Sequence, residues 1–130
     1  MAVGLYAGSF DPIHRGHVDL IEAAGMCLDR LFVVVSTHQG LLVDLAKQLD
    51  VDVLVRGMGK EPQFELQMAA TNTNLPGLGT LFFAPSAATA HISSRMIRER
   101  IRRDGVDAVA DLVPAPVAAL LGASAALSGR

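Results

Sequence analysis

Cysteine is almost absent from this sequence, in which Cys27 is the only one among 130 residues. A single thiol excludes a disulfide within the chain, and the place of Cys27 on the apolar side of a helical pattern predicts a buried residue without a chemical role. Long hydrophobic runs are also missing, although 51% of the residues are hydrophobic. The apolar residues form short runs interrupted by Gly, Asp and Arg, and none approaches the roughly 18 residues of a membrane-spanning helix. We therefore expect a soluble chain without a membrane partner.

The sequence also lacks a basic leader and a strong excess of charge. Its first ten residues, MAVGLYAGSF, contain no Lys or Arg before the first apolar run, so we expect no export signal and a cytoplasmic location. The formal net charge of -2 argues against a nucleic-acid partner for the protein as a whole. One basic cluster is present, and its arginines are compatible with phosphates, with nucleic acid or with a solvated helix face. Its members are Arg95, Arg98, Arg100, Arg102 and Arg103.

Four short runs of β-branched and aromatic residues, bounded by Gly, Asp or Pro, have the pattern of buried strands. They occupy residues 3–7, 31–36, 51–56 and 80–85. Helical patterns lie between them at 17–28, 41–49 and 61–71, and two further helices begin at Ser93 or Ser94 and at the prolines of VPAP. This alternation predicts a single α/β domain over 1–130, with a Rossmann-like doubly wound parallel sheet of four to five strands and C-terminal helices.

The stretch AGSFDPIHRGHVDLIE, residues 7–22, joins the first strand to the first helix and carries the candidate functional residues. A helix that begins at the carboxyl edge of a parallel sheet binds anions there, because its first N–H groups have no partner within the helix. Gly8 and Gly16 allow close approach of the backbone to a ligand, and Ser9 supplies a hydroxyl. His14 and His17 fall on one side of the helical turn, where they can donate hydrogen bonds to phosphoryl oxygens. This combination suits phosphoryl or nucleotidyl transfer.

Two other interpretations of the histidine pair stay open. A zinc site needs three or four ligands, and the other histidines and Cys27 show no ligand spacing with the pair, so we expect no metal held by the protein itself. The second alternative is that the histidines only cap the helix. The crowding of Gly, Ser and two His at one edge of the sheet favours the phosphate interpretation.

The segment GSFDPIHRGH resembles the signature of the nucleotidyltransferase superfamily that carries a T/HxGH motif. In that superfamily a phosphate attacks the α-phosphorus of a nucleoside triphosphate and expels pyrophosphate, without a covalent enzyme intermediate. The resemblance implies that His17 stabilises the pentacoordinate α-phosphate, that His14 helps to hold the triphosphate, and that Ser9 touches the attacking phosphate. Catalysis would then rest on positioning and charge stabilisation, with Mg²⁺ bound to the triphosphate.

The second half of the chain narrows the resemblance to one family. The segments LVRGMGKEPQFELQMAATN and PGLGTLFFAPSAATAHISS are similar to phosphopantetheine adenylyltransferases, whose members read RGxR, YELQMAxMN, PG, a strand ending in Pro, and ISSS in that order. The resemblance implies transfer of AMP from ATP to 4′-phosphopantetheine in coenzyme A synthesis, by a hexamer. Independently of it, consecutive serines that open an arginine-bearing helix form an anion site.

The resemblance assigns roles to particular residues, with His17 and Ser9 as the catalytic ones. The implied ATP site consists of Gly8, Ser9, Phe10, His14, His17, Gly57, Lys60, Glu65, Ser93 and Ser94. The implied acceptor site consists of Ser9, Arg56 and Asn72. From the residues alone, Glu65 and Asn72 would be assigned to an exposed helix face.

The sequence departs from the family pattern in two places. After VVVSTHQ, one helix and one edge strand of the family, roughly thirty residues together, have no counterpart, and the lysine of the missing loop is not replaced nearby. The second family arginine is replaced by Gly59, with Lys60 beside it, and a lysine cannot reproduce the bidentate fork of an arginine. We therefore expect the strand at 31–36 to lie at an edge of the sheet. We also expect ATP binding to be retained and transfer to be slower than in a full-length relative.

Three alternatives to this assignment stay open. The segments FDPIHRGH and ISSRMIRERI look equally like nicotinate mononucleotide adenylyltransferases, which use the same chemistry. A short cytidylyltransferase would match the length, but HISSRMIR lacks the Gly-Ile-Ser-Thr-Thr form of those enzymes. A degenerate nucleotide-binding protein without turnover is the third alternative, and the missing lysine loop favours it.

Overall fold

A computed structural model gives the structure of the protein and describes residues 1–35, 40–58 and 78–128. The chain divides into two compact units. The first comprises Met1–Ser9 and Asp19–Pro85, and the second comprises Phe10–Val18 and Ser86–Arg130. That the whole chain forms a single domain stays a prediction.

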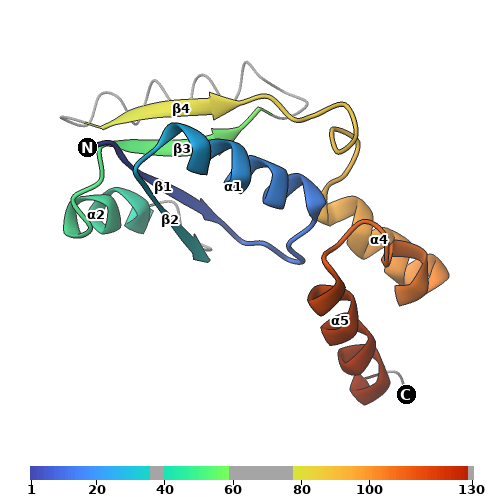
Figure 1. The fold of residues 1–130 in the computed structure, drawn as a ribbon. Coiled ribbons are helices and arrows are strands. Elements are labelled where there is room, and N and C mark those ends of the chain that lie inside the picture. The colour runs from blue at the N-terminus through green and yellow to red at the C-terminus, as the bar shows by residue number, and fades with distance from the viewer. Residues whose placement is uncertain (36–39, 59–77, 129–130) are drawn as a thin grey trace. The chain divides into compact units, whose positions relative to one another are not determined.

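The first unit contains a four-stranded parallel sheet in the order β2-β1-β3-β4 (Figure 1). Its strands are β1 (Val3–Gly8), β2 (Arg30–Val35), β3 (Val53–Gly57) and β4 (Gly79–Phe83). The predicted runs match these strands to within about two residues at either end, which is the usual spread of strand boundaries. The parallel sheet with its helices confirms the predicted α/β, Rossmann-like fold.

One face of the sheet packs against α2 (Gly40–Gln48). Leu5 of β1 is in register with Phe32 of β2 and with Leu54 of β3, so these three side chains form a row across the sheet. Leu5 and Leu54 are 1% exposed and pack with the buried Ala46 of α2. Full burial of a leucine stabilises a fold by about 2 kcal/mol, so this row is a main source of stability in the first unit.

The opposite face packs against α1 (Arg15–Cys27), whose residues from Asp19 onward belong to the first unit. Gly4 precedes Leu5 and therefore faces the other side of the sheet. A Cβ at Gly4 would lie 2.5 Å from Leu28 Cδ1, and one at Gly57 would lie 3.0 Å from Leu20 Cδ1. Helices thus cover both faces of the sheet, as the predicted doubly wound fold requires. Gly4 and Gly57 allow α1 to approach the sheet closely.

The order of the strands creates a switch point between β1 and β3. The chain passes from β1 to its neighbour β2 and then returns to place β3 on the other side of β1. In open parallel sheets, ligands bind beyond the carboxyl ends of the strands at such a point. Gly8 ends β1 and Gly57 ends β3, so the two adjacent strands finish with glycines at the same edge.

The edge of the sheet differs from its centre in exposure. β2 lies at the edge, as expected for a chain that lacks the next family strand, and Val33 and Val35 are 43% and 71% exposed.

Cys27 is exposed, so the prediction that it is buried is wrong. Leu28 takes the position that faces the sheet, and Cys27 lies one helical step away from it.

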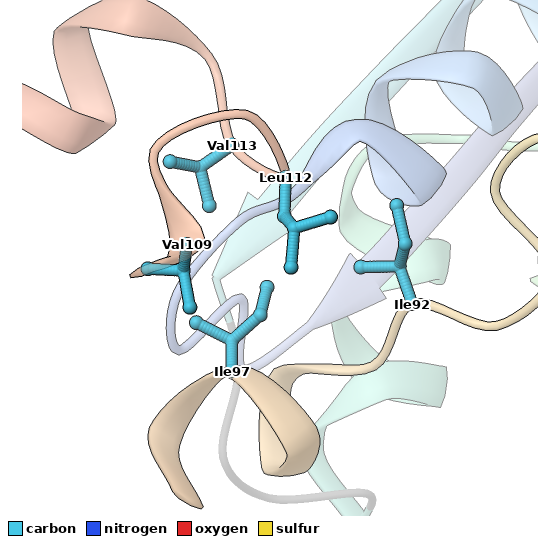
Figure 2. Packing of buried hydrophobic residues seen from close by; sticks show 5 residues of the cluster. All are labelled: Ile92, Ile97, Val109, Leu112 and Val113. Atoms are coloured by element: carbon cyan, nitrogen blue, oxygen red, sulfur yellow. The ribbon is translucent and has the colours of Figure 1, made fainter. Parts of the chain in front are cut away.

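The second unit packs three C-terminal elements around one hydrophobic cluster (Figure 2). These elements are α4 (Ser94–Asp104), the short 3₁₀ helix η1 (Val106–Val109) and α5 (Ala115–Ser128). Ile97, Val109 and Val113 are fully buried in the cluster, and Ile92 and Leu112 are each 9% exposed. The two C-terminal helices are as predicted, whereas η1 was not expected from the sequence.

Local signals define both ends of α4. Ser93 is the N-cap, since its side chain accepts a hydrogen bond from the Met96 N–H at 3.1 Å. Gly105 ends the helix with φ of 91°, and its N–H bonds to the Ile101 carbonyl at 2.9 Å. Glycine reaches this conformation without the strain that a side chain would add. Of the two N-caps predicted from the sequence, Ser93 and Ser94, the structure shows that Ser93 is the N-cap.

No helix within 1–35, 40–58 or 78–128 is both long and apolar enough to cross a membrane. The helix predicted at 61–71 lies outside the described residues.

Candidate active site

The candidate site begins with a turn of residues 10–17, called here the histidine turn, which follows β1 and leads into α1. Phe10 opens it with φ of 46°, in the left-handed region that non-glycine residues seldom occupy. This conformation costs an L-residue roughly 1–2 kcal/mol, so other contacts must hold it in place. Such conformations concentrate at functional sites, which draws attention to this turn.

Two side chains of α4 hold the histidine turn by its carbonyl groups. The Ser94 hydroxyl donates to the Pro12 carbonyl at 2.8 Å, and Arg98 Nη1 donates to the Asp11 carbonyl at 2.6 Å. Ser94 and Arg98 are four residues apart and therefore lie on the same face of α4. The N-terminal turn of α4 consequently lies beside the histidine turn within the second unit.

The two imidazole rings stack on each other. Their centroids are 3.7 Å apart with an angle of 27° between the planes, and the Phe10 ring meets His17 edge-on at 4.9 Å. His14 is only 6% exposed. The spacing of three residues predicted that both rings lie on one side of the turn, and the stacking confirms that they do.

Backbone hydrogen bonds fix which nitrogen of each ring carries the proton. The His14 N–H donates to His17 Nδ1 at 3.1 Å, and the Gly16 N–H donates to His14 Nδ1 at 3.0 Å. A nitrogen that accepts a hydrogen bond holds its lone pair, so the proton of each neutral ring resides on Nε2. Both histidines therefore offer one Nε2–H donor each.

Burial keeps both rings in this neutral form. Desolvation by burial, together with a smaller contribution from the neighbouring His14, lowers the pKa of His17 to about 4. Desolvation by burial also lowers the pKa of His14. At neutral pH the pair therefore consists of hydrogen-bond donors without a formal charge.

Gly16 has a steric reason to stand between the histidines. A Cβ at this position would lie 2.8 Å from His14 Cε1 and 3.0 Å from His14 Nδ1. A side chain would therefore displace the ring that accepts the Gly16 N–H. The glycine of HRGH serves the packing of His14 in addition to the approach of a ligand.

This arrangement has the chemistry of a phosphate site. Nε2–H groups donate to phosphoryl oxygens, and the first turn of α4 adds the partial positive charge of a helix N-terminus. The second unit thus brings together five residues predicted for ATP. They are Phe10, His14, His17, Ser93 and Ser94.

The remaining predicted site residues fall into two groups. Gly8, Ser9, Arg56 and Gly57 belong to the first unit, where they stand at or directly after the carboxyl ends of the adjacent strands β1 and β3. Their roles stay predictions. Lys60, Glu65 and Asn72 lie outside the described residues.

Two arginines contribute contacts that sequence reasoning did not assign. Arg98 was seen only as part of a basic cluster, although its spacing of four from Ser94 places both on one helix face. Arg15 stands between the histidines in HRGH and bonds to the carbonyls of Asp111 and Leu112. No sequence signal indicates the partners of Arg15, because they lie almost a hundred residues away.

Within the described part of the chain, no group of three or more His, Cys, Asp or Glu residues could hold a metal ion. These residues therefore do not build a metal centre of the usual three or four ligands.

Comparison with known proteins agrees with the chemistry of the site. Residues 5–42, which include the histidine turn, match the cytidylyltransferase-like family model. The phosphopantetheine adenylyltransferase of Micrococcus luteus is 31% identical over 144 residues, which cover 85% of this chain and 90% of the relative. That of Actinobacillus pleuropneumoniae serotype 5b is 33% identical with the same coverage. That of Helicobacter pylori is 32% identical over 137 residues, or 79% of this chain and 87% of the relative.

The aligned length exceeds the length of this chain. The first two alignments span 144 residues, although the chain has 130 and only 85% of it takes part. The relatives therefore carry residues that have no counterpart here, as the departures from the family pattern predict. Identity above 30% along most of both chains nevertheless establishes the relationship: the protein belongs to the phosphopantetheine adenylyltransferase family and is a nucleotidyltransferase.

Proposed function

We propose that the protein transfers AMP from ATP to the phosphate of 4′-phosphopantetheine, which gives dephospho-coenzyme A and pyrophosphate in coenzyme A synthesis. The observation that carries this proposal is the stacked pair of neutral histidines, whose Nδ1 atoms both accept backbone N–H bonds. The relatives named phosphopantetheine adenylyltransferase supply the choice of acceptor.

The proposed reaction is a single displacement at phosphorus. An oxygen of the acceptor phosphate forms a bond to the α-phosphorus of ATP, and the bond from that phosphorus to the bridging oxygen of the β-phosphate breaks. The electron pair of the broken bond leaves with pyrophosphate. Negative charge spreads over the equatorial oxygens of the α-phosphate in the transition state, so catalysis depends on placing donors around these oxygens.

Neutral Nε2–H groups fit this requirement. A donor that bonds more strongly to the transition state than to bound ATP accelerates the reaction without tightening substrate binding. In this proposal His17 donates to the α-phosphate and His14 helps to hold the triphosphate. Because the backbone N–H groups occupy both Nδ1 atoms, the rings need not rotate or change tautomer during the reaction.

The other predicted residues complete the two substrate sites. The N-terminal turn of α4, with Ser93 and Ser94, would receive the β- and γ-phosphates, since helix N-termini favour anions. Ser9 and Arg56 would contact the acceptor phosphate from the carboxyl ends of β1 and β3. Mg²⁺ would enter bound to the triphosphate, where it would offset part of the negative charge of the phosphates. The hexamer implied by the resemblance stays a prediction.

Release of pyrophosphate with different acceptors tests the proposal. The protein is incubated with ATP and Mg²⁺ in three parallel reactions, which contain 4′-phosphopantetheine, nicotinate mononucleotide or no acceptor. We expect pyrophosphate only with 4′-phosphopantetheine. Release with nicotinate mononucleotide instead would show that the chain is a nicotinate mononucleotide adenylyltransferase. Equal release of pyrophosphate in all three reactions would show that the chain hydrolyses ATP without an acceptor. Absence of release together with ATP binding would identify a degenerate protein.

A further inference from the structure

Arg15 is the first residue of α1 and stands between the two histidines, yet no role in the reaction has been assigned to it. Its backbone N–H donates to the Leu112 carbonyl at 2.9 Å, and its side-chain Nε donates to the Asp111 carbonyl at 2.6 Å. One residue thus binds two consecutive carbonyl groups in the segment between η1 and α5. All of these groups belong to the second unit.

The carbonyls that Arg15 contacts belong to the segment that enters the hydrophobic cluster of the second unit. Leu112 and Val113 are buried in the hydrophobic cluster with Ile97 and Val109, as Figure 2 shows. Close packing leaves such side chains little freedom to move, and it restricts the backbone that carries them. The packing of Leu112 thus restrains its own carbonyl and, through the adjacent backbone, the carbonyl of the exposed Asp111. Arg15 itself is also exposed.

The position of Arg15 in the sequence links the carbonyls of Asp111 and Leu112 to both imidazole rings. The N–H groups that fix the rings belong to His14 and Gly16, the residues directly before and after Arg15. A rotation of the backbone at Arg15 would therefore move both N–H donors away from the Nδ1 atoms. The hydrogen bond from the Arg15 N–H to Leu112 holds the backbone at one point only. The second hydrogen bond, from Arg15 Nε to Asp111, restricts rotation of the backbone about that point.

We propose that Arg15 is a positioning residue, which ties the first turn of α1 to the carbonyls of Asp111 and Leu112 and thereby keeps His14 and His17 oriented for transfer. This inference rests on the proposed function of the histidines as phosphate donors. It assigns the effect of Arg15 to its Nε–H bond and not to its positive charge. Small displacements of catalytic groups reduce turnover strongly, so one exposed hydrogen bond can affect the rate.

Two substitutions separate the hydrogen bond from the charge. In Arg15→Gln the amide nitrogen stands as many bonds from Cα as Nε does, so a donor is kept and the charge is lost. In Arg15→Met a methyl carbon takes that place, so both are lost. We expect kcat of Arg15→Met to fall roughly three- to tenfold with KM for ATP nearly unchanged, and Arg15→Gln to stay close to the parent. A matched control is Arg103→Met, because Arg103 is exposed at the end of α4 and its Nε donates to the adjacent Asp104.

A spectroscopic readout makes the test independent of turnover. In protein with ¹⁵N-labelled histidine, the ring nitrogen shifts report the proton on Nε2 or Nδ1. We expect a single Nε2–H form for both rings in the parent, in Arg15→Gln and in Arg103→Met, and a mixture of the two forms in Arg15→Met. If these ring shifts are observed but the parent protein shows no turnover, the positioning role is supported and the proposed function is refuted.

Other outcomes would overturn the inference. Equal losses of activity in Arg15→Gln and Arg15→Met, with a raised KM for ATP, would show that the charge contacts the substrate directly. Unchanged ring shifts in a folded Arg15→Met protein would show that Arg15 does not position the histidines. Thermal unfolding of each variant establishes that the compared proteins are folded.

Discussion

His17 is the residue on which the proposed chemistry depends most. Replacement of His17 by Ala removes the Nε2–H donor, and we expect kcat to fall about a hundredfold, as for the loss of one donor to a developing oxyanion. KM for ATP should change little, because the donor is proposed to act mainly in the transition state. His17→Gln keeps an N–H group near the position of Nε2 and should recover part of the rate. Steady-state kinetics check both variants, and equal losses in kcat and ATP affinity would assign His17 to ordinary substrate binding.

The depressed pKa of His17 has a consequence for stability. The ring has a pKa of about 4 in the folded protein, against an ordinary value of 6.5. Between these values the unfolded chain binds more protons than the folded one, so the free energy of unfolding rises with pH. Stability should therefore fall as the pH is lowered from 6.5 towards 4. Urea unfolding at pH 7 and pH 5 measures this change, and it should be smaller in His17→Gln, which has no titrating ring. An equal change in the free energy of unfolding of the parent and of His17→Gln would show that the pH dependence does not arise from His17.

At the scale of elements, the cap of α4 links local sequence to stability. Ser93 accepts the Met96 N–H, so Ser93→Ala leaves one helix N–H without its partner. We expect a loss of about 1 kcal/mol in the free energy of unfolding. Ser93→Asp keeps an acceptor at the N-cap and should lose much less. Urea unfolding compares the two variants, and equal losses would show that the cap contributes nothing specific.

The sequence allowed the strands to be predicted because their short β-branched and aromatic runs are typical of buried parallel strands. The absence of a further family strand also placed β2 at an edge. The histidines and Gly16 could be identified as a group because they are close in sequence. Their tautomers could not be predicted, since they depend on the directions of the His14 and Gly16 N–H groups in the folded turn. The groups that contact this turn lie far away in the sequence, at Ser94, Arg98 and the carbonyls of 111–112. Cys27 was assigned wrongly because it borders the apolar stripe of α1, where one helical step decides burial.

At the scale of the whole molecule, the residues missing relative to the family should affect transfer more than ATP binding. The triphosphate site is proposed to consist of the histidine turn and the start of α4, which the chain retains, whereas the lysine loop is absent. We expect insertion of a family-derived loop, helix and strand between Gln39 and Gly40 to raise kcat and to leave the Kd for ATP nearly unchanged. Calorimetry measures ATP binding, and steady-state assays measure turnover. A folded protein with unchanged turnover would show that the missing loop does not limit the reaction.

Transfer of the adenylyl group of ATP to 4′-phosphopantetheine is the proposed activity of this chain. The most direct measurement uses ATP that is radiolabelled at the α-phosphorus, with separation of the products after incubation with the acceptor and Mg²⁺. We expect the label to appear in dephospho-coenzyme A, at a rate that His17→Ala lowers strongly. Label that remains in ATP or appears only in free AMP, while a full-length relative transfers it under the same conditions, would contradict the claim.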